Sequence, residues 1–548
     1  MFLYNVPPMH PHDLDRRPAS TLEEFQLVTL DEVERIVKNS PSRSCDLDSW
    51  PTWLVKKHLH ALLPTLMHLI NASIRDREVP LAMKQAIITP ILKKPSLKTN
   101  ELSSYRPVSN LSFISKILER VICDQLTKYL NENELHHYYQ SAYRAHHSVE
   151  TALVKVQNDI VKAIDQKKHV VLVLLDLSAA FDTVDHGILL QRLRQRFGIE
   201  SNALDWLSSY LNARGCRVKV GDELSPPSQM QDGVPQGSVL GPVLFSLYIS
   251  PLYDIVRQHG VSTHQYADDC QLYLELDSAD AASCGDGRRQ LEDCVRSIAK
   301  WMSVNKLKLN DNKSEVIAFC PPRVQTPLPF DHLQLCDTAS KFSTKVRDLG
   351  VIFEKSLNPE TFVNSVCSAC YYHLSNIGAI RNSLSKASAE KLIHAFISSK
   401  IDFCNALYVF LPARIMAKLQ RVQNAAARLV SRTPKRHHIT PILRQLHWLP
   451  IQYRVQYKIA MLAWKTLNAR APKYMKDMIE EYEPPRELRS TGTRLLVVSQ
   501  PRTELGKRAF SFAAPYVFNG LPENLRVETS HDAFKRNLKT CIFIRAFD

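Results

Sequence analysis

The stretch HVVLVLLDL at residues 169–177 is the most hydrophobic expected strand of this chain. It is apolar and β-branched on both faces, a pattern typical of a central strand buried on both sides. Asp176 follows the apolar run as the last residue but one of the stretch. A second apolar stretch, HQYADDCQLYLEL at residues 264–276, carries Asp268 and Asp269 at the turn between two expected strands. The pattern predicts a buried sheet with three carboxylates beside its strands.

Carboxylates next to buried strands are costly unless something compensates their charge. A divalent metal compensates several at once, and hard oxygen ligands select Mg²⁺ or Mn²⁺. Two such ions about 4 Å apart can clamp the attacking and leaving oxygens of a phosphoryl transfer. The alternative is that Asp176 caps the following helix and Asp268–Asp269 form a polar turn. It explains any one of these residues, but less well all three together.

Around these stretches the periodicity predicts alternating helices and strands. Helices are expected at 113–133, 148–166, 186–197, 201–212, 238–258 and 288–303. Strands are expected at 86–92, 216–221, 228–233, 306–310 and 315–320. Beyond residue 360 the pattern is helical to about 480, a Pro-rich linker follows at 483–501, and a short mixed segment ends the chain.

The composition is that of a globular protein, with 45% hydrophobic and 23% charged residues in 548. These values exclude a disordered or collagen-like chain. The longest apolar run, residues 170–175, is too short to cross a membrane, and the first residues lack the pattern of a signal peptide. Twelve scattered Cys are typical of reduced thiols, so we expect an intracellular protein that is not secreted.

The positive charge is concentrated in the last third of the chain. Residues 376–548 hold 29 Lys/Arg against 12 Asp/Glu, whereas the first 375 hold 41 against 43. Such a local field indicates a polyanionic partner, most often nucleic acid, although a solubilising surface is the alternative. Five cations recur at helical spacing beside an apolar stripe: Arg414, Lys418, Arg421, Arg428 and Arg432.

Seven ordered blocks resemble those of reverse transcriptases. YADD at 266–269 resembles the catalytic turn, LLDLSAAFDTVDH (174–186) the first catalytic block, and GVPQGSVLGPVLFSLYI (233–249) the block that contacts template and nucleotide. YRPVSNLSFISKILERVI (105–122) and QSAYRAHHSVETAL (140–153) resemble finger blocks of non-LTR retrotransposon enzymes, and 307–319 and 346–353 resemble the two downstream blocks. The C-terminal stretches are similar to the tails of LINE elements of the jockey and CR1 type.

This resemblance implies an α/β (α+β) fold of the right-hand polymerase type. The fingers and the palm, an antiparallel sheet plus helices, would span 73–355 after an N-terminal helical extension at 1–72. A thumb-like basic helical region would span 356–440, and a helical C-terminal region typical of retrotransposons 441–548. The basic stripe would then contact the template–primer backbone, with a solvated helix face as the alternative.

The resemblance also implies roles for individual residues. Asp176 and Asp268 would bind two Mg²⁺ ions (or Mn²⁺), Asp269 would support them, and the backbone carbonyl of Leu177 would complete one shell. Lys313 would act on the pyrophosphate or triphosphate, with a plain surface lysine as an equal alternative.

Substrate contacts are implied at further positions. Phe181 would exclude ribonucleotides sterically, although a core Phe is the alternative, and the role of Asp182 stays open. The remaining contacts are expected at Gly233, Pro235, Gln236 and Gly237 of the GVPQG loop and at Arg106 and Arg144. Ala142 replaces a Gly that relatives commonly have, which predicts altered finger geometry if φ is positive there.

The implied activity is RNA-directed DNA polymerisation, with an RNA template, a DNA primer and dNTPs as partners and no membrane. An endonuclease domain is not expected in the chain. The family implies action in the nucleus, the cytoplasm or both. The alternative is a truncated or domesticated copy that binds nucleic acid without catalysis. The Cys367–Cys370 pair lacks a partner pair at zinc-finger spacing, so a zinc site is not expected.

Overall fold

The computed structural model describes residues 18, 20–178, 181–310, 313–322, 328–483 and 493–548. Contacts divide the chain into two compact units, each assembled from separate segments. The first comprises residues 1–143, 176–260 and 293–310, and the second 144–175, 261–292 and 311–548. In the described parts, no helix has the length and apolar character that crossing a bilayer requires.

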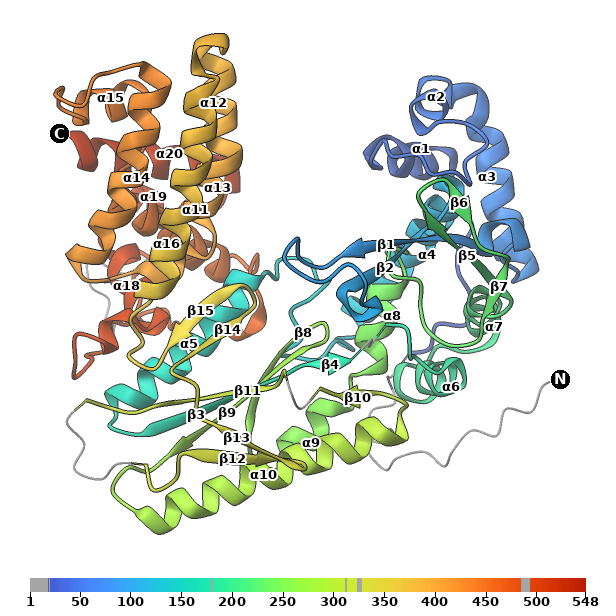
Figure 1. Cartoon of the computed structure of the whole chain (residues 1–548), viewed down its shortest axis with the longest axis horizontal. Coiled ribbons are helices and arrows are strands. Elements are labelled where there is room, and N and C mark those ends of the chain that lie inside the picture. The colour runs from blue at the N-terminus through green and yellow to red at the C-terminus, as the bar shows by residue number, and fades with distance from the viewer. Residues whose placement is uncertain (1–17, 19, 179–180, 311–312, 323–327, 484–492) are drawn as a thin grey trace. The chain divides into compact units, whose positions relative to one another are not determined.

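The second unit contains the sheet that the opening stretch predicts. Its antiparallel order is β11 (Glu315–Phe319), β3 (His169–Leu175), β9 (Asp269–Leu276) and β8 (Ser262–Tyr266), as Figure 1 shows. Residues 170–173 of β3 are fully buried, which confirms the central strand. Helix α5 (Val149–Asp165) packs on β3 and β8 and begins with a capping box between Ser148 and Thr151.

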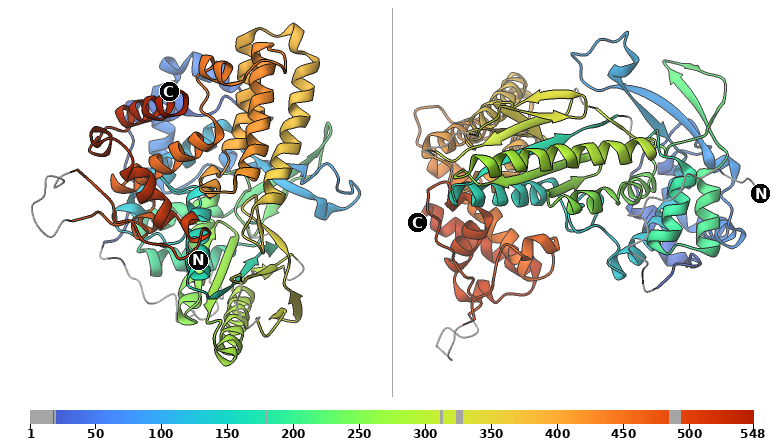
Figure 2. Two further views of the ribbon diagram at one scale, coloured as in Figure 1. Left: turned by 90° about the vertical axis from the view of Figure 1, so that its left-hand side faces the viewer. Right: turned by 90° about the horizontal axis from the view of Figure 1, so that it is seen from below.

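Helices dominate the rest of the second unit. Two hairpins, β12 (His332–Leu335) with β13 (Thr338–Lys341) and β14 (Lys345–Asp348) with β15 (Val351–Glu354), precede them. The longest helices are α11 (Glu360–Ala379), α14 (Ala413–Ser431), α16 (Ile451–Leu467) and α20 (His531–Phe547). Helices α11 and α14 lie side by side (Figure 2). Helix α16 packs against α20. Shorter helices are α12 (Lys386–Ile393), α13 (Ser399–Asp402), α15 (Thr440–Gln445), α17 (Lys473–Lys476), α18 (Phe510–Asn519) and α19 (Glu523–Arg526).

The first unit combines a sheet with helices. Strand β1 (Gln85–Leu92) pairs antiparallel with β2 (Tyr105–Asn110) and parallel with β5 (Arg214–Val220), which also pairs with β6 (Glu223–Leu224) and β7 (Ser228–Met230). A short ladder joins β4 (Leu177–Ser178) to β10 (Lys308–Leu309). The helices are α1 (Leu30–Asn39), α2 (Thr52–Lys57), α3 (Leu59–Asp76), α4 (Phe113–Glu132), α6 (His186–Phe197), α7 (Ser201–Leu211), α8 (Gly241–Tyr248) and α9 (Leu252–Gln258). Helix α10 (Ala281–Val304) has residues in both units.

Two expectations about secondary structure were wrong. The helix expected at 238–258 is two helices, because Pro251 supplies no N–H and disfavours a helical conformation at Ser250. The mixed segment expected at the end is helical through α18, α19 and α20, with Ser530 capping the last. The condition stated for Ala142 is not met: the positive φ of 58° lies at Tyr143, and Ala142 is buried without it, so the absence of a Gly at position 142 predicts no strain there.

Candidate active site

The YADD sequence forms a tight hairpin turn. Tyr266 pairs with Asp269, so Ala267 and Asp268 are the two turn residues between β8 and β9. Ala267 has a φ of 56° although it is not Gly, and two-residue hairpin turns require such a conformation at their first position. Ala267 is buried, Asp268 half-buried and Asp269 exposed. Two consecutive carboxylates therefore lie at the end of this hairpin, Asp268 in the turn and Asp269 as the first residue of β9.

Asp176 is held by Asn310. The backbone N–H of Asn310 donates to the carbonyl oxygen of Asp176 at 2.9 Å, and its side-chain Nδ2 donates to Asp176 Oδ2 at 3.2 Å. The adjacent ladder pairs Leu177 with Leu309, which fixes the chain on both sides. Asn310 was not predicted as a site residue. In the sequence, only its place in the block at 307–319 points to a role for Asn310, and the resemblance implies Lys313 as the functional residue of that block.

In the sequence, the three acidic residues lie next to the paired strands β3 and β9. Leu175 of β3 pairs with Cys270 of β9; Asp176 follows the former and Asp269 precedes the latter. Carboxylates and a backbone carbonyl suit Mg²⁺ in donor chemistry. In the described ranges, no three His, Cys, Asp or Glu side chains are grouped so that they could hold a metal ion.

The GVPQG loop is fixed by backbone contacts. Gly233 donates its N–H to Val184 at 2.8 Å and has a φ of 88°; a Cβ there would lie 2.7 Å from the Asp182 carbonyl oxygen. Gly237 has a φ of 123°, and a Cβ would lie 2.6 Å from the Ser109 carbonyl oxygen. Both glycines therefore permit a backbone approach that any side chain would block.

Two side chains predicted to meet the nucleotide have partners inside the protein. Gln236 Nε2 donates to both carboxylate oxygens of Asp182, at 3.1 Å each. Burial raises the pKa of Asp182, and the Gln236 hydrogen bond opposes that rise. Phe181 is half-buried and stacks on Phe245, with ring centroids 4.6 Å apart.

Behind the same loop lies a buried carboxylate that sequence reasoning missed. Glu119 of α4 is 1% exposed, and its Oε2 accepts the backbone N–H groups of Val239 and Leu240 at the start of α8. Burial raises the pKa of Glu119, whereas the charge of buried Arg214 and these hydrogen bonds lower it. No local sequence pattern marks Glu119, because its partners are 120 residues away.

A second buried carboxylate contacts strand β9 of the β8–β9 hairpin. Asp348 of β14 accepts a hydrogen bond from Gln271 of β9 at 2.6 Å. Burial raises the pKa of Asp348 to about 7; the Gln271 bond lowers it and the charge of Asp269 raises it further. The chain therefore keeps a carboxyl that is largely protonated below neutral pH next to β9.

Other predicted site residues occupy scattered positions. Lys313 is exposed in a turn before β11. Arg106 is exposed on β2 opposite Ile91. Arg144 is half-buried, and desolvation lowers its pKa to about 10. Pro235 is buried, and its carbonyl oxygen accepts a hydrogen bond from Ser238 Oγ at 2.8 Å.

The predicted basic stripe lies on α14 and its C-terminal cap. Arg414 and Lys418 both pair with Glu360 of α11, at 2.5 and 2.7 Å, and lower its pKa. The other three donate to backbone carbonyls: Arg421 to Ala417, Arg428 to His437 and Arg432 to Arg381. All five cations therefore have partners within the chain, although Arg414, Arg421 and Arg432 stay exposed.

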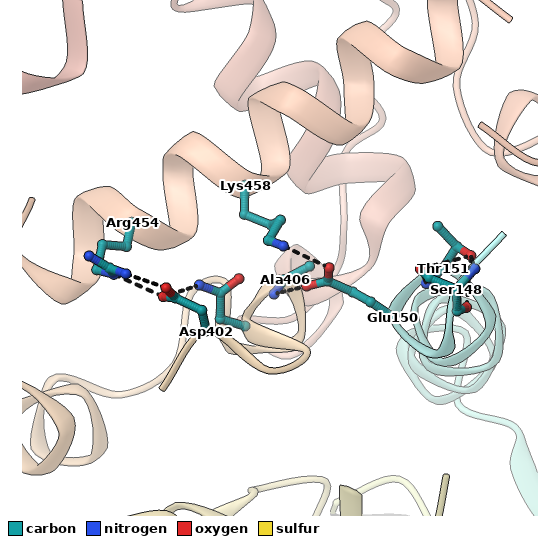
Figure 3. Close-up of polar contacts among 8 residues, drawn as sticks. Ser148, Glu150, Thr151, Asp402, Ala406, Arg454 and Lys458 are labelled. Atoms are coloured by element: carbon teal, nitrogen blue, oxygen red, sulfur yellow. Dashed lines mark hydrogen bonds and ion pairs between the residues drawn. The ribbon is translucent and has the colours of Figure 1, made fainter. Parts of the chain in front are cut away.

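Two ion pairs join the C-terminal helices to each other and to α5 (Figure 3). Glu150 Oε1 accepts the N–H of Ala406 at 3.0 Å, and Oε2 pairs with Lys458 of α16 at 3.0 Å. One turn earlier on α16, Arg454 Nε donates to Asp402 at 2.8 Å. Because α5 packs on β3, these contacts attach the helical region to the sheet within the second unit.

Sequence comparisons bear on this arrangement. A family profile described as "Reverse transcriptase (RNA-dependent DNA polymerase)" matches residues 91–353. The chain is 26% identical over 440 residues to the "Probable RNA-directed DNA polymerase from transposon BS" of Drosophila melanogaster, covering 78% of this chain and 47% of the relative. It is 25% identical over 518 residues to the "RNA-directed DNA polymerase from mobile element jockey" of the same species, covering 91% and 53%.

A third relative is the "Probable RNA-directed DNA polymerase from transposon X-element" of Drosophila melanogaster, 28% identical over 373 residues, covering 66% of this chain and 39% of the relative. The chain thus spans about half, or less, of the length of the curated relatives that it matches. The matched region contains β3, the YADD turn and the GVPQG loop. Residues 91–353 therefore form a reverse transcriptase domain, and the chain is related to the RNA-directed DNA polymerases of non-LTR retrotransposons.

Proposed function

We propose that this chain is an RNA-directed DNA polymerase that copies retrotransposon RNA into DNA. The observation that carries the proposal is the strand pair β3–β9: Asp176, Asp268 and Asp269 all lie within two residues, along the chain, of the paired Leu175 and Cys270. Three carboxylates at these positions match the chemistry of nucleotidyl transfer. Primer extension on an RNA template, wild type against Asp268→Ala, tests the proposal.

The metal site would use Asp176, Asp268, Asp269 and the backbone carbonyl of Leu177. Bound Mg²⁺ or Mn²⁺ would lower the pKa of the primer 3′-hydroxyl and neutralise triphosphate charge. Asn310 orients the Asp176 carboxylate through its hydrogen bond. Asp268 and Asp269 are consecutive at the β8–β9 turn, so the hairpin fixes their backbone before substrate binds, which supports a preorganised site.

The GVPQG loop would bring its backbone against the incoming dNTP. Its two glycines permit the close approach. Gln236 would offer a polar group to the nascent base pair. Arg106 and Arg144 would contact triphosphate or template, and Lys313 would steady the pyrophosphate, because cations complement these anions.

Phe181 is proposed as the steric gate against the 2′-hydroxyl. Phe181→Ala is expected to lower the preference for dNTPs over rNTPs by about a hundredfold, since a space the size of a ring opens beside the sugar. The ratio of kcat/KM values for dGTP and GTP measures it. Phe245→Leu, which alters the ring beneath Phe181, is the control and should leave the ratio within about threefold. An unchanged ratio in Phe181→Ala would instead assign this ring to the core.

The exposed face of α14 is proposed to contact the template–primer backbone. Arg421→Glu with Arg428→Glu is expected to weaken RNA–DNA duplex binding about tenfold or more at low salt and to reduce the salt slope by about 2, because two phosphate contacts are lost. Fluorescence anisotropy from 50 to 300 mM salt measures both. Arg289→Glu with Arg296→Glu, on α10, makes the same charge change and is the control. If both double variants lost the same duplex affinity, the effect would come from the change in net charge and not from contacts of α14.

A further inference from the structure

The side chain of Gln236 is held from one side by an acidic residue that has no assigned role. Its Nε2 is 3.1 Å from both Asp182 oxygens, so the carboxylate accepts the amide hydrogens of a residue 54 positions away. An ionised carboxylate has no hydrogen to donate. The Gln236 amide must therefore turn its NH₂ toward Asp182 and its carbonyl oxygen away.

The backbone on either side makes this contact rigid. Val234 donates its N–H to the carbonyl oxygen of Phe181 at 2.8 Å, and Gly233 donates to Val184 at the same distance. These bonds flank Asp182, whose own carbonyl lies against Gly233. The main-chain oxygen of Gln236 accepts the N–H of Ser109 at 2.7 Å. Each residue of the pair is thus anchored independently of their side-chain contact.

We propose that Asp182 is a positioning residue for nucleotide addition: its carboxylate orients the Gln236 amide so that Oε1 is presented to the incoming nucleotide as a hydrogen-bond acceptor. The inference rests on the proposed polymerase function and adds a fixed donor and acceptor orientation for the Gln236 amide in the loop. A free glutamine amide rotates between two orientations and offers a donor half of the time. Asp182 removes the wrong orientation before substrate binds, which lowers the entropic cost of binding.

The test is a donor–acceptor exchange. Asp182→Asn keeps the shape but places an amide against an amide, so Gln236 can adopt either orientation. We expect kcat/KM for dNTPs to fall about tenfold, mostly through KM, with an unchanged unfolding midpoint. Asp182→Asn with Gln236→Glu restores one donor facing one carboxylate, and the carboxylate again presents only acceptors outward. This double variant should recover at least half of the lost kcat/KM on a logarithmic scale.

Asp232→Asn is the matched control, because it removes an exposed carboxylate that precedes the GVPQG loop and should leave KM unchanged. The contact would be purely structural if Asp182→Asn lowered kcat/KM together with the unfolding midpoint and if adding Gln236→Glu did not restore kcat/KM. Full activity of Asp182→Asn would also overturn the inference. Failure of the proposed function looks different, because the wild type itself would then not extend the primer.

Discussion

Asp268→Ala is expected to abolish primer extension, with kcat falling about a thousandfold or more on an RNA template with dNTPs and Mg²⁺. Asp268 is the second residue of the two-residue turn between β8 and β9 and is half-buried. Under the proposed function the Asp268 carboxylate would bind the divalent ions, and Ala could not replace it, since such ions must be held within about half an ångström of the productive geometry. Single-turnover extension of a labelled primer measures the rate directly.

The control for this substitution is Asp277→Ala, which removes an exposed carboxylate that follows β9 and should leave kcat unchanged. Duplex binding is measured in parallel in Ca²⁺, where both variants should match the wild type within about twofold. Loss of binding in Asp268→Ala would make the effect one of folding. A wild type that binds duplex but never extends the primer would favour the alternative, a nucleic-acid-binding protein without catalysis.

Elements determined by local sequence were predicted well. The strands around 169–177 and 264–276 and the helices at 113–133 and 186–197 are confirmed, because apolar periodicity is a property of the segment itself. The prediction of one helix at 238–258 was wrong because apolar character alone does not register the break at Pro251. The C-terminal helices were underestimated for a related reason: α18 contains Pro515 and follows a Pro-rich linker.

Whether a candidate site residue could be predicted depended on how far along the chain its partner lies. Those within short blocks, such as Asp268 and Gln236, could be chosen from sequence, and their roles stay predictions. Asn310 and Glu119 were not chosen, because each acts through a partner more than a hundred residues away. Spacing along the chain says nothing about such pairs. The basic stripe shows the opposite limit. Helical spacing predicts four of its cations on α14, with Arg432 at the left-handed C-cap instead, but it does not predict that Glu360 pairs with two of them.

Glu119→Ala is expected to destabilise the first unit by roughly 3–5 kcal/mol, the usual cost of removing one member of a buried charged network. The carboxylate accepts two N–H groups at the start of α8 and lies near buried Arg214, so truncation leaves two donors and a cation without compensation. Urea unfolding followed by the fluorescence of buried Trp206, which lies in the same unit, measures the loss.

Glu119→Gln separates the two contributions to that loss. Its amide oxygen still accepts a hydrogen bond from Val239 or Leu240 but no longer neutralises Arg214, so the loss should be intermediate, about half of the Ala value. Glu132→Ala, at the exposed end of α4, removes a surface carboxylate and should cost under about 0.5 kcal/mol. Because Glu119 accepts the N–H groups of Val239 and Leu240, which follow Ser238 just after the GVPQG loop, the Gln variant should also raise KM for dNTPs at temperatures where it stays folded. A Gln variant as unstable as Ala would show that charge, rather than the hydrogen bonds, fixes the loop.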